Sequence, residues 1–328
     1  MTDVIGVDLG GTKIAVARLR GGELSDSTIE PTDLSGQEAL IEQLVRIIDH
    51  VRGDELDAVG IGVPSIVEFE TGRVVSSANI PLADVPLREV LGDRVGVPVF
   101  VDNDATVASL AEAHDEQLQM VARDLVMLTV GTGVGGGLVL GGRIYRGATG
   151  GAGELGHTMV GLDLSGGPVP AAGDFPQPGS LEGVAAGHAL DHLVTAFADA
   201  HPGSALAKHR AQGEPLTGVE AVEFAQDGDP DAQRLIELWG ERLGIGIANV
   251  INTFDPEEVV IGGGAARAGE LLLTPARRTA AAYVLPGLGK RTMIRAARHG
   301  VRAGVLGAAL LAVHERDGSS SPAPTEVS

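Results

Sequence analysis

A buried strand, a glycine turn, a second strand and a Gly-Gly pair occur twice in this chain, and this repeat limits the folds open to it. The first copy begins at Val4 and the second at Leu125. Short apolar runs bounded by glycines are typical of strands joined by tight turns. Two copies of a unit this large predict a duplicated α/β architecture with two lobes, because a solenoid would need several more copies.

The segments outside the repeat supply further elements. Apolar spacing predicts helices at 37–52, 103–113, 181–200, 217–226, 230–252, 267–283 and 301–315, and strands at 23–30, 57–63, 97–102, 257–263 and 292–297. We expect an N-terminal lobe of residues 1–118, completed by a C-terminal helix at 301–316, and a larger lobe of residues 119–300. Residues 317–328 are polar and rich in Pro and Ser, which predicts a disordered tail.

Composition excludes several functional classes. The 328 residues include no cysteine, which rules out disulfides, thiolate zinc sites and a cysteine nucleophile. The formal net charge of −20 argues against nucleic acid and anionic membranes as partners, because both require a basic face. An anionic ligand would need a local device, such as glycine-loop amides, a helix N-terminus or a metal ion. We find no signal peptide and no apolar run of membrane-spanning length, so we expect a cytoplasmic protein.

The glycine turns of the two copies are candidate phosphate-binding loops. The first contains Gly10, Gly11 and Thr12, and the second is GTGVGGG at 131–137. GTGVGG matches the dinucleotide fingerprint GxGxxG, but a strand follows it where that fingerprint needs a helix. Each turn alone is open to a purely structural interpretation, yet two matched copies that each carry a Thr favour phosphate. The run GGGAA at 262–266 adds a strand-to-helix turn with free amides.

Polar residues at strand ends form a second group of candidates. Asp8 ends the first strand directly before a glycine turn, where it could hold Mg²⁺ beside phosphates or merely cap the turn. Asn103 and Asp104 lie where a buried strand meets a helix. A helix cap would need only one such residue, and the carboxyl ends of strands are where ligands bind in α/β sheets.

The stretch GAGELGH at 151–157 pairs Glu154 with His157. A His close to a Glu is open to three interpretations: a metal ligand, a catalytic base or part of a polar substrate site. A long Gly/Pro-rich passage, residues 165–183, follows without an obvious helix or strand.

Five motifs in order resemble the ROK family of sugar kinases (repressor, open reading frame, kinase), and bacterial ATP-dependent glucokinases in particular. They are DLGGTK at 8–13, DNDA at 102–105, GTGVGGG at 131–137, GAGELGH at 151–157 and IGGG at 261–264. The resemblance covers residues 4–315. It implies an actin-like (ribonuclease-H-like) α/β fold, duplicated in two lobes with the active site in the cleft between domains.

The resemblance also implies a role for each polar candidate. Asp104 matches the base that takes a proton from a sugar hydroxyl, and Asn103 and Asn79 match asparagines on the sugar side. Glu154, His157 and Glu182 match residues that contact the sugar ring. The ATP-holding positions are Asp8, Gly10, Gly11, Thr12, Lys13, Thr132, Gly133, Gly263 and Gly264, with Mg²⁺ at Asp8 directly or through water. Lys13 is equally open to being a solvated strand lysine.

The sequence departs from the family at its zinc motif. Gly173, Phe175 and Ser180 stand where many members have cysteines, so we expect no zinc. Polyphosphate-dependent glucokinases of the family also lack these cysteines, but their loop signatures differ, which favours ATP. A Gly-Trp pair usual after the segment containing Asn79 is missing, which leaves the sugar open.

We therefore expect a hexose kinase that converts glucose to glucose 6-phosphate, with hexose and ATP as ligands and with a homodimer or a dimer of dimers as the assembly. The alternatives are a kinase for fructose, mannose or an N-acetylated hexosamine, a polyphosphate-using glucokinase, and a catalytically silent sugar sensor. Asp104 and both glycine turns argue against the sensor. The chain starts at its first strand without a helix-turn-helix, so a DNA-binding repressor is not expected.

Overall fold

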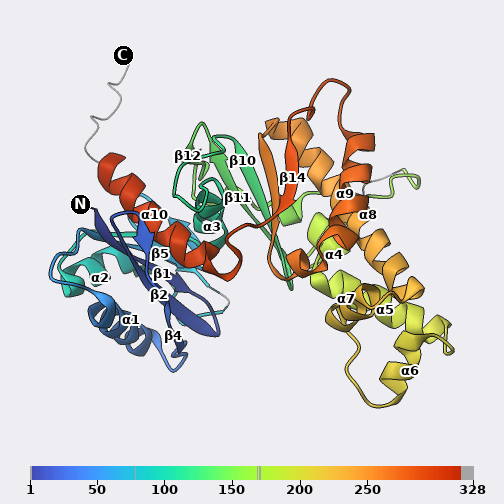
Figure 1. Ribbon diagram of the computed structural model, residues 1–328, viewed down its shortest axis with the longest axis horizontal. Coiled ribbons are helices and arrows are strands. Elements are labelled where there is room, and N and C mark those ends of the chain that lie inside the picture. Colours follow the sequence, from blue (N-terminus) through green and yellow to red (C-terminus); the bar gives the residue numbers. More distant parts are fainter. Residues whose placement is uncertain (1, 78, 168, 170, 319–328) are drawn as a thin grey trace. The chain divides into compact units, whose positions relative to one another are not determined.

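The chain passes four times between two structural units, and the computed structural model describes residues 2–77, 79–167, 169 and 171–318 (Figure 1). The first unit consists of Met1–Arg123, Gly137–Gly153 and His299–Ser328, and the second of Asp124–Gly136 and Glu154–Arg298. Residues 137–153 thus belong to the first unit, whereas the expected boundaries assigned them to the second. Of the expected disordered tail, residues 319–328 lie outside the described residues.

The first unit is built on a six-stranded sheet with the order β3-β2-β1-β5-β9, in which β4 also pairs with β2. The strands are β1 (Asp3–Leu9), β2 (Lys13–Arg20), β3 (Glu23–Leu24), β4 (Thr28–Pro31), β5 (Ala58–Val63) and β9 (Val99–Asn103). β1 and β2 form an antiparallel hairpin, while β1, β5 and β9 run parallel. The carboxyl ends of these three strands therefore lie at one edge of the sheet.

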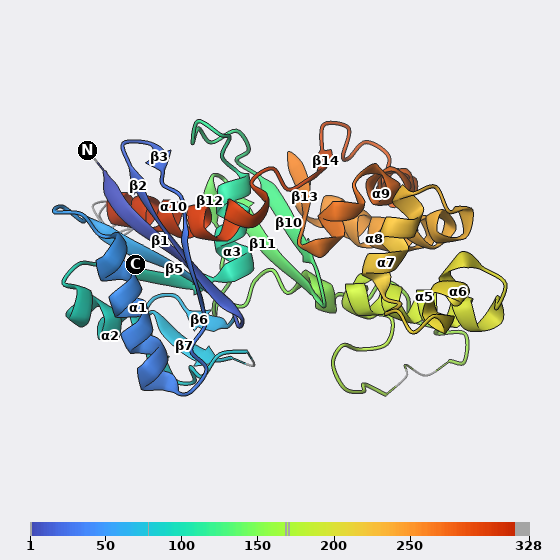
Figure 2. The ribbon, with the colours of Figure 1, turned by 60° about the horizontal axis from the view of Figure 1, so that its bottom comes forward.

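Helices cover both faces of this sheet. They are α1 (Gln37–Val51), α2 (Leu87–Val95), α3 (Asp104–Glu112) and α10 (Ala303–Gly318). Because side chains alternate along a strand, Ile5 and Val7 join the apolar core shared with α1 and α2, while Gly6 faces α10. Figure 2 shows α1 on one face of the strands and α10 on the other.

Glycines let α10 approach the sheet closely. A Cβ atom on Gly6 would overlap the carbonyl oxygen of Val305, and one on Gly60 would overlap that of Ala308. The last helix of the chain therefore lies directly on its first strand and on β5, with no side-chain layer between them at these points.

A smaller sheet that the sequence patterns did not predict completes the first unit. Its strands are β6 (Ile66–Glu68), β7 (Arg73–Ser76) and β8 (Val85–Pro86), in the order β6-β7-β8. The strands are two to four residues long, too short to show a clear alternation of apolar and polar residues.

The second unit repeats the hairpin and adds parallel strands. Its strands β10 (Leu125–Val130), β13 (Glu258–Gly262) and β14 (Met293–Ala296) run parallel in that order. Strand β11 (Val134–Leu140) begins in this unit and ends in the first, where it pairs with β12 (Arg143–Ile144). Most glycines of GTGVGGG thus belong to a strand, and only residues 131–133 form the turn.

The other elements of the second unit are helical. They are η1 (Leu155–His157), α4 (Leu181–Ala185), α5 (Gly187–Ala200), α6 (Ala205–Ala211), α7 (Gly218–Gln226), α8 (Pro230–Phe254), η2 (Gly264–Ala268) and α9 (Glu270–Tyr283). α8 starts cleanly because Asp229 caps it and Pro230 occupies its first position. Within the described part of the chain, every helix is too short or too polar to cross a membrane.

Three expected elements differ from the structure. The helix expected at 181–200 is interrupted at Ala186, which is extended because the next residue donates its amide to Gly131. The strand expected at 23–30 is split into β3 and β4. The glycines at 262–264 lead into the 3-10 helix η2 and not into the N-terminus of α9, which begins only at Glu270.

The close approach of α10 predicts an asymmetric response to glycine substitution. Gly60→Ala should destabilise the protein by about 1–3 kcal/mol, because the new methyl group meets the backbone of α10 and cannot be accommodated by a side-chain movement. Gly203→Ala is the matched control, because this exposed glycine lies outside the helices and strands and a Cβ atom there meets nothing within 4 Å. Urea unfolding of both variants checks this, and equal stability of the two would contradict the packing described here.

Candidate active site

Two carboxylates meet at the edge where the parallel strands of the first unit end. In the register of the sheet, Asp8 of β1 is opposite Gly62 of β5, and Gly62 is opposite Asp102 of β9. Asp104 follows two residues later, at the start of α3. Gly62 makes the approach possible, since a Cβ atom on it would lie 2.6 Å from Cγ2 of Val107 and 3.5 Å from Cα of Asp104.

The environment of Asp8 raises its pKa from 3.8 to about 6. Burial is the main cause, the negative charge of Asp104 adds to it, and Lys13 partly opposes both. Gly304 in the first turn of α10 makes room for this carboxyl group, since a Cβ atom on it would lie 2.5 Å from Cγ of Asp8. Asp8 is therefore a partly enclosed carboxyl group beside a second acid, an environment in which a bound cation would favour the ionised form.

Asn103 caps helix α3. Its Oδ1 accepts hydrogen bonds from the amides of Ala105 (2.9 Å) and Thr106 (3.2 Å), and its Nδ2 donates to the carbonyl oxygen of Ser65 (3.4 Å). Asn103, and not an aspartate, is therefore the capping residue of this helix. Asp104 is the first helical residue and accepts from the amide of Ala105 at 2.8 Å. The cap fixes the turn from which the side chain of Asp104 projects.

Asp102 stabilises the same turn through a hydrogen bond and an ion pair. Its side chain is buried, accepts the amide of Asn103 at 2.9 Å and pairs with Nε of Arg146 at 2.7 Å. Burial raises the pKa of Asp102, and Arg146 partly offsets this rise. The guanidinium group of Arg146 also lies 3.4 Å from the ring centre of Phe69 and bonds Glu315 of α10. No sequence pattern singled out Arg146.

The first glycine turn lies beside Asp8 and Asp104. The amide of Gly10 bonds the carbonyl oxygen of Lys13 at 2.9 Å and closes the turn, while Thr12 and Lys13 are exposed. Asn79 is also exposed, and its Cβ atom and carbonyl oxygen would lie 3.1 Å from a Cβ atom on Gly11. The structure thus gathers Asp8, the first glycine turn, Asn79, Asn103 and Asp104 in the first unit.

The second glycine turn is held by the start of helix α5. The amide of Gly131 bonds the carbonyl oxygen of Gly133 at 2.9 Å, and the carbonyl oxygen of Gly131 accepts the amide of Gly187 at 2.7 Å. The carbonyl oxygen of Thr132 lies 2.8 Å from Nδ1 of His188. Gly263 packs against the end of β10, because a Cβ atom on it would lie 2.5 Å from the carbonyl oxygen of Val130. Gly264 follows it and is exposed.

Glu154, His157 and Glu182 all lie in the second unit, where η1 contacts α4. Nε2 of His157 lies 3.7 Å from Oε2 of Glu154. Nδ1 of His157 is buried and has no hydrogen-bond partner among the described residues. Glu182 accepts the amide of Val134, the residue after the second glycine turn, at 2.7 Å.

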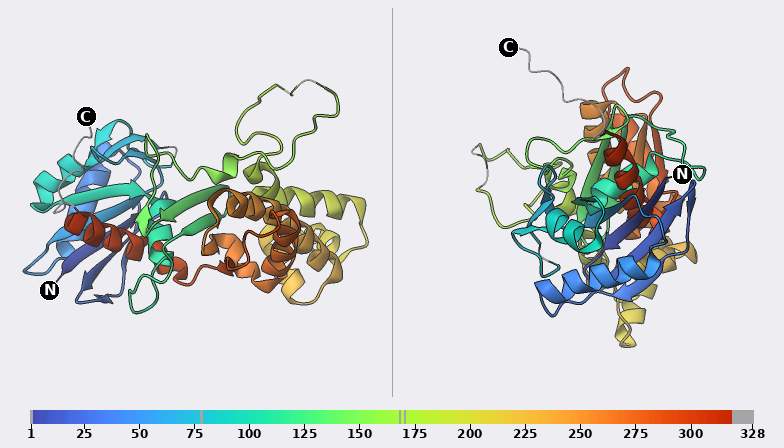
Figure 3. Two further views of the ribbon diagram at one scale, coloured as in Figure 1. Left: turned by 90° about the horizontal axis from the view of Figure 1, so that it is seen from above. Right: turned by 90° about the vertical axis from the view of Figure 1, so that its left-hand side faces the viewer.

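The passage from 158 to 180 is ordered at its base by backbone pairing (Figure 3). The amide of Val160 bonds the carbonyl oxygen of Gly179, and that of Leu181 bonds the carbonyl oxygen of Thr158, both at 2.9 Å. Ser180, at a position where a family cysteine would stand, caps α4 through the amide of Gly183. Thus one of the three positions without cysteine has a structural role of its own.

The other two substituted positions lie nearer the tip of this passage. Gly173 exchanges two hydrogen bonds with the side chain of Gln177, and the exposed ring of Phe175 meets the His157 ring edge-on at 5.2 Å between centres. Among the described residues, no group of three or more His, Asp or Glu side chains could hold a metal ion. Pro168 and Pro170 of this passage lie outside the described residues.

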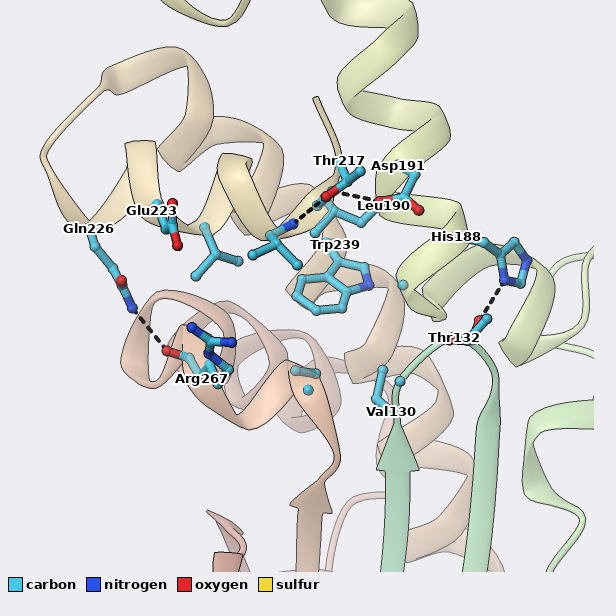
Figure 4. A pocket seen from close by; sticks show the side chains of 17 residues that line it. Val130, Thr132, His188, Leu190, Asp191, Thr217, Glu223, Gln226, Trp239 and Arg267 are labelled. Carbon is cyan, nitrogen blue, oxygen red and sulfur yellow. Dashed lines mark hydrogen bonds between the residues drawn. The ribbon is translucent and has the colours of Figure 1, made fainter. Parts of the chain in front are cut away.

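A cavity of about 440 Å³ opens beside the second glycine turn (Figure 4). Apolar side chains from α5, α7, α8 and η2 line much of it, namely Leu190, Val219, Val222, Trp239 and Ala265. Figure 4 shows Thr132 and His188 on one side of Trp239 and Arg267 on the other. Of the expected ATP-binding residues, Thr132 and Gly264 line this cavity.

Sequence patterns missed the apolar lining residues and assigned no role to His188. The contributing helices are far apart in sequence, so no local motif could reveal the cavity. One weak signal existed, since Trp239 is the single tryptophan of a chain with 3% aromatic residues. Its indole nitrogen donates to the carbonyl oxygen of Ala185 at 2.7 Å, which fixes the ring at the cavity wall.

Comparisons with known proteins match nearly the whole chain. The ROK family model matches residues 4–315. A glucokinase of Halalkalibacterium halodurans is 34% identical, over 98% of this chain and 98% of that protein. A ROK hexokinase structure from Thermus thermophilus is 37% identical with a TM-score of 0.75 and covers 97% of this chain and 100% of that one. A ROK family glucokinase structure from Streptomyces griseus, in complex with glucose and AMPPNP, is 30% identical with a TM-score of 0.75 and covers 95% and 99%. These likenesses confirm the expected actin-like α/β fold.

The raised pKa of Asp8 predicts a stability that depends on pH. Between pH 3.8 and about 6 the folded chain keeps a proton that the unfolded chain releases, so the free energy of unfolding falls as the pH rises through this window. Asp8→Asn removes this fall. The free energy of unfolding is measured without metal at pH 4 and at pH 7. Between these two pH values, that of the variant should rise relative to that of the wild type by at most about 3 kcal/mol.

Asp33→Asn provides a control whose stability difference from the wild type should stay nearly constant between pH 4 and pH 7. Hydrogen bonds from Ser35 lower the pKa of the exposed Asp33, so this side chain is already ionised in the folded chain at pH 4 and does not change charge over this range. If the difference in unfolding free energy between Asp8→Asn and the wild type stays constant with pH, the pKa of Asp8 is not raised in the folded chain.

Proposed function

The chain belongs to the ROK family and is a sugar kinase, and we propose that it phosphorylates glucose at the 6-hydroxyl with ATP as the donor. The convergence of Asp8 and Asp104 at the strand ends, beside the first glycine turn, is the observation that carries this proposal. Phosphoryl transfer needs an acceptor hydroxyl in line with the γ-phosphate, and it needs the charge on that phosphate to be neutralised. One acid of the pair serves the hydroxyl and the other serves a cation.

Asp104 is the proposed general base. Its carboxylate accepts the proton of the 6-hydroxyl as the new oxygen–phosphorus bond forms and the bond to ADP breaks. A positioned base typically contributes a factor of about 10²–10⁴ to the rate. The capped turn supports this role, because Asn103 and the buried Asp102 hold the first residue of α3 in place.

The remaining polar residues serve the sugar ring. The proposed contacts, by the motifs of the sequence, are Asn79, Asn103, Glu154, His157 and Glu182. Carboxylate and amide groups suit a ring of hydroxyls, because they accept and donate several hydrogen bonds each. The buried and unpartnered Nδ1 of His157 supports a ligand at this position within the described part of the chain.

The cavity beside the second glycine turn favours ATP over polyphosphate as the donor. Its apolar wall, with Leu190, Val222 and Trp239, suits a nucleobase and offers nothing to a chain of phosphates. The backbone amides of the turns suit the phosphates themselves. The proposed donor contacts are Asp8, Gly10, Gly11, Thr12, Lys13, Thr132, Gly133, Gly263 and Gly264.

Mg²⁺ fits the carboxyl group of Asp8. The ion is commonly held by one or two carboxylates together with substrate phosphates and water, so it needs no cage of protein ligands. When bound, it would neutralise phosphate charge. The burial of Asp8 next to Asp104 makes its ionised form costly without a cation, which supports a cation at this position. The cytoplasmic location and the homodimer expected from the sequence stay predictions.

Formation of the sugar phosphate, measured over a panel of hexoses with ATP or polyphosphate as the donor, tests the proposed reaction. We expect turnover with glucose and ATP, and Asp104→Asn should lower kcat by a factor of about 10²–10⁴ with little change in the dissociation constant for glucose. The amide keeps the shape of the side chain but cannot take the proton.

Asp93→Asn is the matched control, because this exposed aspartate lies on α2 away from the strand ends. It should keep full activity. If no hexose of the panel is phosphorylated with either donor, the kinase proposal is refuted. Full activity of Asp104→Asn would refute only the assignment of the base.

The single tryptophan predicts an optical signal for the donor. Trp239 is 3% exposed and lines the cavity, so ATP that inserts its base there should change the fluorescence of the protein. Polyphosphate has no base and should leave the emission unchanged. A titration with each donor in the presence of Mg²⁺ checks this, and an equal response to both would contradict the assignment of the cavity to the base.

A further inference from the structure

Two segments, GAGELGH and the start of α4, meet the hairpin of β10 and β11 at a single residue, Val134. Its amide donates to Oε2 of Glu182 at 2.7 Å. Its carbonyl oxygen faces Gly156 of the GAGELGH segment, since a Cβ atom on Gly156 would overlap it. Val134 is buried and begins β11 directly after the second glycine turn. The two segments that carry the proposed sugar contacts Glu154, His157 and Glu182 therefore both touch the backbone of the residue that directly follows the second glycine turn.

Gly133 leaves the space that this contact requires. A Cβ atom on Gly133 would lie 2.5 Å from Oε2 of Glu182, while one on Gly131, in the same turn, would meet nothing within 4 Å. Neither glycine has a backbone conformation in the left-handed region, so the backbone does not require glycine at either position. The absence of a side chain at 133 is thus explained by the carboxylate beside it.

The carboxylate of Glu182 has capacity for a second ligand. A carboxylate offers about four acceptor positions on two oxygens, and the amide of Val134 uses one of them on Oε2. Oε1 is the oxygen farther from the hairpin, at 3.8 Å from the Cβ position of Gly133 compared with 2.5 Å for Oε2. Glu182 can therefore bind a hydroxyl of the hexose without releasing the hairpin.

We propose that Glu182 couples the hexose to the phosphate donor by holding both the sugar and the amide of Val134. The inference rests on the proposed function, because it takes Glu182 as a sugar contact. A hexose that fixes this carboxylate also fixes the hairpin that binds phosphate, so each ligand favours binding of the other. Binding free energies must couple equally in both directions. A substitution in the hairpin should therefore change the affinity for the hexose.

The first test measures glucose binding by calorimetry without any nucleotide. Gly133→Ala should weaken glucose by about tenfold, the size expected when a hydrogen bond to a charged group is lost, because the methyl group displaces the carboxylate. Gly131→Ala should bind glucose like the wild type, although it belongs to the same turn. The methyl group at 133 meets the end of a flexible side chain, so the variant should fold, and its melting temperature checks this.

The second test measures the coupling itself with AMPPNP. In the wild type, saturating glucose should tighten binding of the analogue several-fold. Glu182→Ala should reduce this factor to about one, whereas Glu154→Ala should keep it at saturating glucose. Glu154 is the matched control because it is also a proposed sugar-side carboxylate, but its closest ionic partner is His157 and not the hairpin.

Each outcome separates the inference from the proposed function. A wild type that binds glucose and AMPPNP, combined with equal glucose affinities of Gly133→Ala and Gly131→Ala, would overturn the coupling and leave the kinase proposal intact. Equal coupling factors in Glu182→Ala and Glu154→Ala would do the same. A wild type that binds no hexose would overturn both.

Discussion

The first unit depends on the direct contact between helix α10 and the strands β1 and β5. This contact exists because Gly6 and Gly60 have no side chain, so the backbone of the helix can lie on that of the strands. It joins the end of the chain to its beginning and brings Gly304 against the carboxyl group of Asp8. The enclosure that raises the pKa of Asp8 is therefore a consequence of how the last helix packs.

The second unit uses the same device around a turn instead of a helix. A Cβ atom on Gly156 would overlap the carbonyl oxygen of Val134, and one on Gly187 would lie 2.7 Å from that of Gly131. Gly133 leaves room for Glu182 in the same way. Glycines of the motifs thus act mainly by letting separate segments approach the hairpin closely. Conformational freedom at positive φ is a smaller part of their role, since it applies to Gly153 and Gly263 but not to Gly131, Gly133, Gly156 or Gly187.

Local patterns predicted what depends on local sequence. The strands before Asp8 and Asn103 and helix α3 follow from apolar runs and a capping residue, so the carboxylates at the strand ends could be foreseen. The interruption at Ala186 could not, because a hydrogen bond between Gly187 and Gly131, 56 residues apart, breaks an otherwise regular helical pattern. The cavity around Trp239 was hidden for the same reason, since its wall is assembled from helices that have no motif in common.

In the passage from 158 to 180, backbone pairing of the two ends positions a residue that follows the loop. To bring Glu182 to the hairpin, the chain must fix the two ends of the loop, and it does so with the backbone bonds that join 158–160 to 179–181. The cap formed by Ser180 then sets the direction of α4, on which Glu182 lies. The contact of Phe175 with His157 adds a side-chain link in which neither residue needs a charge. The pairing at the base of the passage is therefore sufficient to bring Glu182 to Val134, and no cysteine takes part in this contact.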